Sequence, residues 1–307
     1  MTYSLISYWL PYFLKQHGLK DTIKGISFFL YWRFKKLLYD FSKERIVEVN
    51  GCSLSLIPND VGISEELFLF NTHEPFSTKV VMKNLREGMV CLDVGSNLGY
   101  YATLESKIVG KTGRVIAIEP SPVSFKYLEH NLALQNQSNY EAFNFACGKE
   151  DREVRFLITG KSNLNRVLKE GEKTSSDMNV VKVPVKKLDT FLKEKLLKKL
   201  DFLRMDVEGY EMQILEGAKE SIGKFKPMIQ IEVHLHKLGK NNTKKLLDGF
   251  KTHGYQNTYF ITREFDISPI FGNESNMSKT NLEKLMKDLE DELLPRCFIL
   301  FLEKPIN

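Results

Sequence analysis

Residues 90–101 read VCLDVGSNLGYY, a short apolar run followed by an acidic turn that carries two glycines. The run at 90–92 is typical of a strand covered on both faces, and residues 100–108 then carry apolar side chains at helical spacing. Gly95 can adopt the backbone angles of a sharp strand-to-helix turn, and the missing side chains at Gly95 and Gly99 let a ligand approach the main chain. The segment therefore predicts the floor of a nucleoside pocket.

Two carboxylates decide which cofactor such a pocket would bind. The dinucleotide fingerprint needs glycines where this chain has Asp93 and Leu98, and a carboxylate there would repel pyrophosphate. Asp93 would instead suit the cationic amino group of S-adenosylmethionine. Residues 114–118 read as the next strand, and the following Glu119 can accept both ribose hydroxyls, at roughly 1.5–3 kcal/mol for each bond. Either residue alone could be a helix cap or a surface acid, but together they favour S-adenosylmethionine over NAD.

Three motifs in this chain resemble those of the FkbM family of S-adenosylmethionine-dependent methyltransferases. They are the turn at 93–99, the sequence IEP at 118–120, and the sequence LRMDVEGYE at 203–211. The resemblance covers residues 74–233 and implies a class I methyltransferase (Rossmann-like) fold. We therefore expect an α/β domain with a seven-stranded, mostly parallel sheet and helices on both faces, which agrees with the alternation of strand and helix patterns along the core of the chain.

The residues predicted to bind the cofactor follow the ends of four strands of this sheet. They are Asp93, Gly95, Ser96, Asn97, Gly99, Tyr100, Glu119, Pro120, Ala146 and Asp206. The resemblance also implies that the loop at 71–75 borders the cofactor, so that His73 and Glu74 could touch it, although solvated loop residues would look the same.

Candidate catalytic residues come after the fourth and fifth strands. Methyl transfer to a hydroxyl needs placement of the acceptor and a group that takes its proton. Asp206 is the candidate for orienting acceptor or methionine, Glu208 and His234 are the candidates for the base, and a turn-bracing role for Glu208 is the alternative. If strand alternation continues far enough, Glu232, His234 and His236 share a face and could hold a metal with Asp206, but H-x-H alone is weak evidence and we predict no metal.

The composition limits the cell compartment and the partners. The formal charge of +5 comes from 44 basic and 39 acidic residues, and the lysines at 193–199 are interpreted as a solvated helix face, so nucleic-acid binding is not expected. Four cysteines without a C-x-x-C pair are typical of reduced thiols, and no signal-peptide pattern precedes residues 6–14. We expect a cytoplasmic protein.

The chain outside the core falls into recognisable segments. Residues 1–43 form a predicted N-terminal helical extension whose apolar face could lie on an anionic membrane, on the domain or on a second subunit of a homodimer. Residues 44–307 form the predicted methyltransferase domain, beginning with a β-hairpin around Asn50-Gly51 that we expect to cap one end of the pocket. Residues 153–185 interrupt the alternation and are predicted to be a lid over the acceptor.

The acceptor follows from the family resemblance alone. Family members methylate hydroxyls of sugars or polyketide-like products, so we expect a hydroxyl of a sugar, glycolipid or related natural product. The alternatives are methylation of a protein or small-molecule amine, and a non-catalytic protein that binds S-adenosylmethionine.

Overall fold

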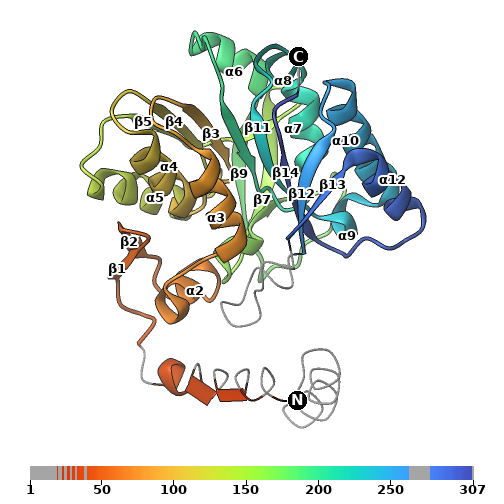
Figure 1. Ribbon diagram of the computed structural model, residues 1–307. Coiled ribbons are helices and arrows are strands. Elements are labelled where there is room, and N and C mark those ends of the chain that lie inside the picture. Colours follow the sequence, from red (N-terminus) through yellow and green to blue (C-terminus); the bar gives the residue numbers. More distant parts are fainter. Residues whose placement is uncertain are drawn as a thin grey trace.

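An eight-stranded sheet forms the centre of the protein (Figure 1). The computed structural model describes residues 40–262 and 277–305 and, before them, residues 19, 23, 26, 27, 30, 31 and 33–37. The strand order is β13-β12-β14-β11-β10-β3-β4-β5. The strands are β3 (Val90–Val94), β4 (Arg114–Ile118), β5 (Tyr140–Phe143), β10 (Phe202–Met205), β11 (Met228–Val233), β12 (Asn257–Thr262), β13 (Met277–Asn281) and β14 (Phe298–Leu302).

The order of the strands places a binding crevice at β3. The strands β11, β10, β3, β4 and β5 are parallel, and the chain proceeds from β3 outward to β4 and β5 before it returns to β10 on the other side. In an open α/β sheet, ligands bind outside the carboxyl ends of the strands where the order reverses. The strand β14 is antiparallel to both of its neighbours, as expected for the closing strand of a methyltransferase sheet.

All seven strands predicted for this sheet are present, and the structure adds an eighth. That strand, β13, pairs with β12 at the edge of the sheet. The sequence at 263–277 has no strand or helix pattern and reads as irregular, and residues 263–276 of it lie outside the described residues. The polar sequence of β13, MSKTN, has no apolar alternation because an edge strand needs little burial on either face.

Helices cover both faces of the sheet and create two apolar cores. The helices α2 (Ile63–Phe70), α3 (Pro75–Asn84), α4 (Tyr100–Val109) and α5 (Pro122–Leu134) pack on one face. The helices α6 (Leu188–Glu194), α7 (Glu211–Gly217), α8 (Lys219–Phe225), α10 (Lys240–Thr252) and α12 (Leu282–Glu290) pack on the other. Neighbouring strand residues enter opposite cores, so that Cys91 faces the first set of helices and Leu92 the second.

A second, four-stranded sheet stands over the carboxyl edge of the first. It consists of β6 (Ala146–Gly148), β9 (Asn179–Lys187), β7 (Arg152–Ile158) and β8 (Arg166–Val167), in that order. Residues 140–146 read as one strand in the sequence, but they belong to two strands of different sheets. The β5 strand ends at Phe143, and Ala146 begins β6, which pairs with β9.

The hairpin at the start of the domain forms as predicted, but it packs against α5 and not at the end of the pocket. The strands β1 (Arg45–Val49) and β2 (Cys52–Leu56) are joined by Asn50 and Gly51, which both have positive φ, 51° and 73°. The β2 strand is bonded to α5, because the Ser55 N–H donates to Asn131 Oδ1 over 2.7 Å and the Asn131 amide donates to the Ser55 carbonyl over 3.0 Å. The hairpin braces α5 and does not cap the crevice. Among the described residues, no helix is both long and apolar enough to span a bilayer.

Candidate active site

A cleft opens at the carboxyl ends of β3, β4 and β10 and encloses about 570 Å³, part of it open to solvent. The second sheet contributes one wall through Phe156, the 162–165 turn and Arg166, as expected for the predicted lid segment. Among the predicted site residues, those that line the cleft are Gly95, Asn97, Glu119, Pro120, Ala146, Asp206 and Glu208. The cleft also has apolar lining that we had not predicted to bind the cofactor, formed by Phe145, Val167, Val207, Tyr210 and Ile214.

The glycine turn after β3 lies against the backbone at the end of β10. Gly95 has φ +85°, and a Cβ placed on it would lie 1.9 Å from the backbone carbonyl oxygen of Asp206. Only glycine allows this approach, because every other side chain would have to displace the backbone of the β10 end. The Ser96 hydroxyl is buried and donates to the Asp93 carbonyl over 2.9 Å, so Ser96 braces the turn from behind.

Glu119 lines the cleft just after β4, and both of its carboxylate oxygens are bonded to backbone N–H groups. Its Oε2 accepts the Asn97 N–H and its Oε1 accepts the Ser121 N–H, both over 2.8 Å. Burial raises the pKa of the Glu119 carboxyl to about 7, although these two N–H bonds act in the opposite direction. Each carboxylate oxygen retains a second lone pair, so the ribose hydroxyls of S-adenosylmethionine fit here as donors.

Asp93 lies behind the cleft, where it faces Arg204. The Arg204 guanidinium lies 3.2 Å from Asp93 Oδ1 through Nη1 and 3.2 Å from Asp206 Oδ2 through Nη2, and it stacks 4.0 Å from the centre of the Tyr101 ring. Asp93 is fully buried, and its Oδ2 has no hydrogen-bond partner among the described residues. Burial raises the pKa of the Asp93 carboxyl, and the charge of Arg204 opposes this rise. Its predicted contact with the methionine amino group stays a prediction, as do those of Ser96, Gly99 and Tyr100, which also lie outside the cleft lining.

Arg204 connects the buried carboxylates of the site, a role that we did not predict from the sequence. Its side chain also lies 4.0 Å from Glu74 Oε2, which accepts the Tyr101 hydroxyl over 2.9 Å. One guanidinium thereby joins carboxylates from the α3 start, β3 and the β10 end. The available signal was an arginine inside the apolar strand sequence FLRM, since a charge in a buried strand has to be paired.

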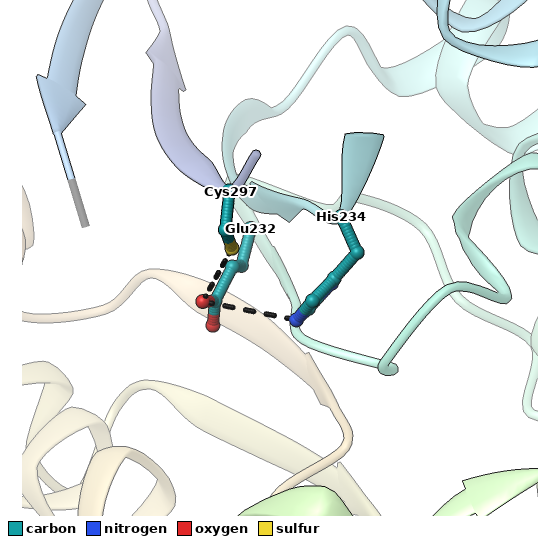
Figure 2. Close-up of side chains that lie close together, drawn as sticks. All are labelled: Glu232, His234 and Cys297. Carbon is teal, nitrogen blue, oxygen red and sulfur yellow. Dashed lines mark hydrogen bonds and ion pairs between the residues drawn. The ribbon is translucent and has the colours of Figure 1, made fainter. Parts of the chain in front are cut away.

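A second cluster of titratable side chains surrounds His234, just after β11. Its Nδ1 lies 2.6 Å from Glu211 Oε1, and its Nε2 lies 3.4 Å from Glu208 Oε2 and 3.8 Å from Glu232 Oε1. Figure 2 shows Glu232 between the His234 ring and the Cys297 thiol, which donates to Glu232 Oε1 over 3.0 Å. Cys297 comes from the chain just before β14, so sequence distance hid it from this cluster.

The charges around His234 determine its protonation. Burial alone would lower the pKa of His234, but Glu232 and the hydrogen bonds with Cys297, Glu208 and Glu211 raise it well above its usual value. These neighbours therefore favour the protonated imidazole. His234 and Glu232 adjoin as the strand pattern predicted, but β11 ends at Val233. His236 lies exposed on the short helix α9 (Leu235–Leu238), with its Nδ1 3.0 Å from the Arg296 carbonyl.

Asp206 and Glu208 differ in how readily they accept a proton. Burial, followed by the charge of Glu232, raises the pKa of Asp206 well above its usual value, and Arg204 opposes this. Burial also acts to raise the pKa of Glu208, but His234 and the ion pair with Lys237 lower it overall.

Three overlapping groups among the described residues have ligand atoms within 4.8 Å of one another and could hold a metal ion: Glu232 with His234 and Cys297, Asp206 with Glu208 and His234, and Glu74 with Asp206 and Glu232. Of these residues, Asp206 and Glu208 line the cleft, so the groups bring carboxylates to its wall. Such a surface also fits the positive sulfonium of S-adenosylmethionine. Our prediction of a reaction without a metal stays a prediction.

The sheet order, the glycine turn after β3 and the acid after β4 together define the class I methyltransferase domain, which uses S-adenosylmethionine as methyl donor. The sequence model of the family described as "Methyltransferase FkbM domain" matches residues 93–257, more than half of the chain. The chain belongs to this family.

Two curated relatives carry methyltransferase names. "Methyltransferase 1" of Beauveria bassiana is 32% identical over 142 residues, which are 41% of this chain and 57% of the relative. "Methyltransferase sdnD" of Sordaria araneosa is 30% identical over 166 residues, 45% of this chain and 63% of the relative. The chain thus spans about three fifths of each relative's length. A solved structure, methyltransferase FkbM from Methylobacillus flagellatus KT, is similar with 15% identity and a TM-score of 0.43, over 71% of this chain and 45% of that one.

Proposed function

We propose that the protein is an S-adenosylmethionine-dependent O-methyltransferase that acts on a hydroxyl of a sugar, a glycolipid or a related natural product. The observation that carries the proposal is the placement of Asp206. Its carboxyl lies in the cleft at the end of β10, beside the glycine turn, and its pKa is raised by burial and by Glu232. A raised pKa makes the ionised Asp206 carboxylate a stronger proton acceptor, as a general base requires.

In the proposed reaction, one carbon–oxygen bond forms and one carbon–sulfur bond breaks. S-adenosylmethionine, when bound, supplies a methyl group on a positively charged sulfur. The acceptor oxygen forms its bond to this methyl carbon while the carbon–sulfur bond breaks, and the hydroxyl proton passes to the Asp206 carboxylate. Arg204 holds that carboxylate in place over 3.2 Å.

Glu208 and His234 suit supporting roles better than the role of base. Glu208 has a lowered pKa and is paired with Lys237 and His234, so it attracts a proton weakly. Both ring nitrogens of His234 face carboxylates, Glu208 and Glu211, which favour its protonated form and leave it poorly placed to take a proton from the acceptor. We assign proton acceptance to Asp206 and positioning of the 206–211 loop to the other two.

The test is a methyl-transfer assay with S-adenosylmethionine that carries a deuterated methyl group. The purified protein is incubated with pools of sugars, glycolipids and polyketide-like alcohols, and products are found by mass shift. The methyl carbon shift in NMR then separates an O-methyl from an N-methyl product. An N-methyl product would favour the amine alternative, and binding of S-adenosylhomocysteine without turnover on any pool would favour a non-catalytic binding protein.

Two variants with the same chemical change locate the base. We expect Asp206→Asn to slow methyl transfer by about 10²–10⁴-fold. Glu208→Gln should slow it far less, because its carboxylate is already neutralised by Lys237 and His234. The base assignment is wrong if Asp206→Asn keeps most of the activity while Glu208→Gln loses it.

A further inference from the structure

A stripe of large apolar side chains runs along the N-terminal helical residues. It consists of Leu19, Ile23, Ile26, Leu30, Phe34 and Leu37, which follow one another at steps of three or four residues and are between 44% and 81% exposed. At about 100° per residue, all six positions fall within an arc of about 80°. A helix that leaves such a stripe in water needs a partner surface.

The stripe points away from the domain. Lys35 lies on the opposite side of the helix, about 160° from Leu19 at this spacing. Its ammonium donates to the Phe68 and Leu69 carbonyls at the end of α2, over 3.1 and 3.3 Å. In Figure 1 the segment lies at the edge of the molecule, beyond α2. Packing of the stripe on the domain, one of the arrangements that the sequence allowed, is therefore not what the structure has.

The charge of the chain gathers in the same segment. Residues 1–43 hold seven lysines and arginines against two aspartates, whereas residues 44–307 hold 37 basic and 37 acidic side chains. The whole formal excess of +5 thus accompanies the stripe.

We propose that the stripe docks on an anionic lipid surface, with the helix lying in the plane of the membrane. Amphipathic helices bind in this way, with the apolar side chains at the boundary of the acyl chains and flanking basic side chains among the headgroups. Lys35 and Lys36 instead hold the helix to α2, since the Lys36 ammonium lies 2.8 Å from Glu65 Oε1. A second copy of the chain fits less well as the partner, because each copy would bring the same positive excess to the interface. This inference does not depend on the proposed reaction.

The test is sedimentation of the full chain with vesicles of phosphatidylcholine alone or with about 30 mol% phosphatidylglycerol. We expect binding to the anionic vesicles and little binding to the neutral ones. Leu30→Glu combined with Phe34→Glu should reduce the bound fraction by at least about fivefold, since it places charges in the stripe. The matched control is Leu293→Glu, which changes a leucine that is 70% exposed outside the segment and should bind as the wild type does.

Unchanged affinity of the variants for S-adenosylhomocysteine shows that the domain is folded. The proposal is overturned if the wild type ignores anionic vesicles, or if the double variant binds them as well as Leu293→Glu does. It is equally overturned if sedimentation velocity without lipid shows a dimer that the double variant dissociates while no vesicle binding is seen, because the stripe would then be covered by a second copy.

Discussion

Glu119→Gln should weaken cofactor binding and remove its dependence on pH. The Glu119 carboxyl of the free protein has a pKa of about 7, because burial outweighs two backbone N–H donors. Ribose hydroxyls can donate only to the ionised form at full strength, so binding of S-adenosylhomocysteine should lower this pKa. Loss of one charge-assisted hydrogen bond costs about 1.5–3 kcal/mol, so we expect the dissociation constant to rise by about 10- to 150-fold at pH 8.

The sign of the pH effect follows from the same shift. A pKa raised on folding favours the protonated form, so the free protein loses this contribution to stability as pH rises through about 7. Ligand binding has the opposite sign, because it needs the carboxylate. Wild-type affinity should fall about tenfold for each pH unit below 7 and level off above it, whereas the affinity of Glu119→Gln should stay nearly flat.

Isothermal titration calorimetry between pH 5.5 and 8.5, in buffers of different ionisation enthalpy, measures both the affinity and the protons released. Glu129→Gln, a change of an exposed glutamate on α5, is the control and should behave as the wild type. Thermal unfolding checks that Glu119→Gln is folded, since a Gln side chain leaves one buried N–H facing its amide group. A Glu119→Gln variant that binds with wild-type affinity and wild-type pH dependence would refute the ribose assignment.

Three further predictions test the surroundings of the cleft. Arg204→Met leaves buried carboxylates without their cation and should lower the free energy of unfolding by about 3–5 kcal/mol in urea titrations. Adding Asp93→Asn should recover part of this loss. A loss below about 1 kcal/mol would contradict the pairing. Gly95→Ala should prevent binding of S-adenosylhomocysteine and destabilise the protein more than Gly171→Ala does. Gly171 also has a positive φ, 74° against 85° at Gly95, but a Cβ there would meet nothing within 4 Å, so equal thermal shifts would disprove the close contact with Asp206. Dialysis against EDTA should leave the methyl-transfer rate within about twofold, and restoration of a lost rate by one divalent metal would show that the carboxylates hold it.

Local patterns predicted the sheet because its strands are buried on both faces and its turns need particular residues. Backbone geometry requires the apolar run at 90–92 and the glycine at 95, and the acid at 119 matches one ligand group. Such requirements can be recognised within a few residues of sequence. The same holds for the hairpin at Asn50-Gly51, whose two positive φ angles are what that pair of residues tolerates. The β13 strand was missed because an edge strand with polar side chains carries no periodic signal.

The sequence by itself determined the fold class and the family, and it predicted which residues at the strand ends would bind the cofactor. Only the tertiary structure decided what each carboxylate faces. Asp93 faces Arg204 because the two are direct partners in the register of β3 and β10. Cys297 contacts Glu232 because β14 pairs with β11, which lies more than sixty residues away in the sequence. The pKa of each carboxylate and of His234 depends on its neighbours and on its burial. Both are set by strand pairing between distant parts of the chain, so a short stretch of sequence does not contain them. The proton that we first gave to His234 or Glu208 therefore passes to Asp206 in our proposal.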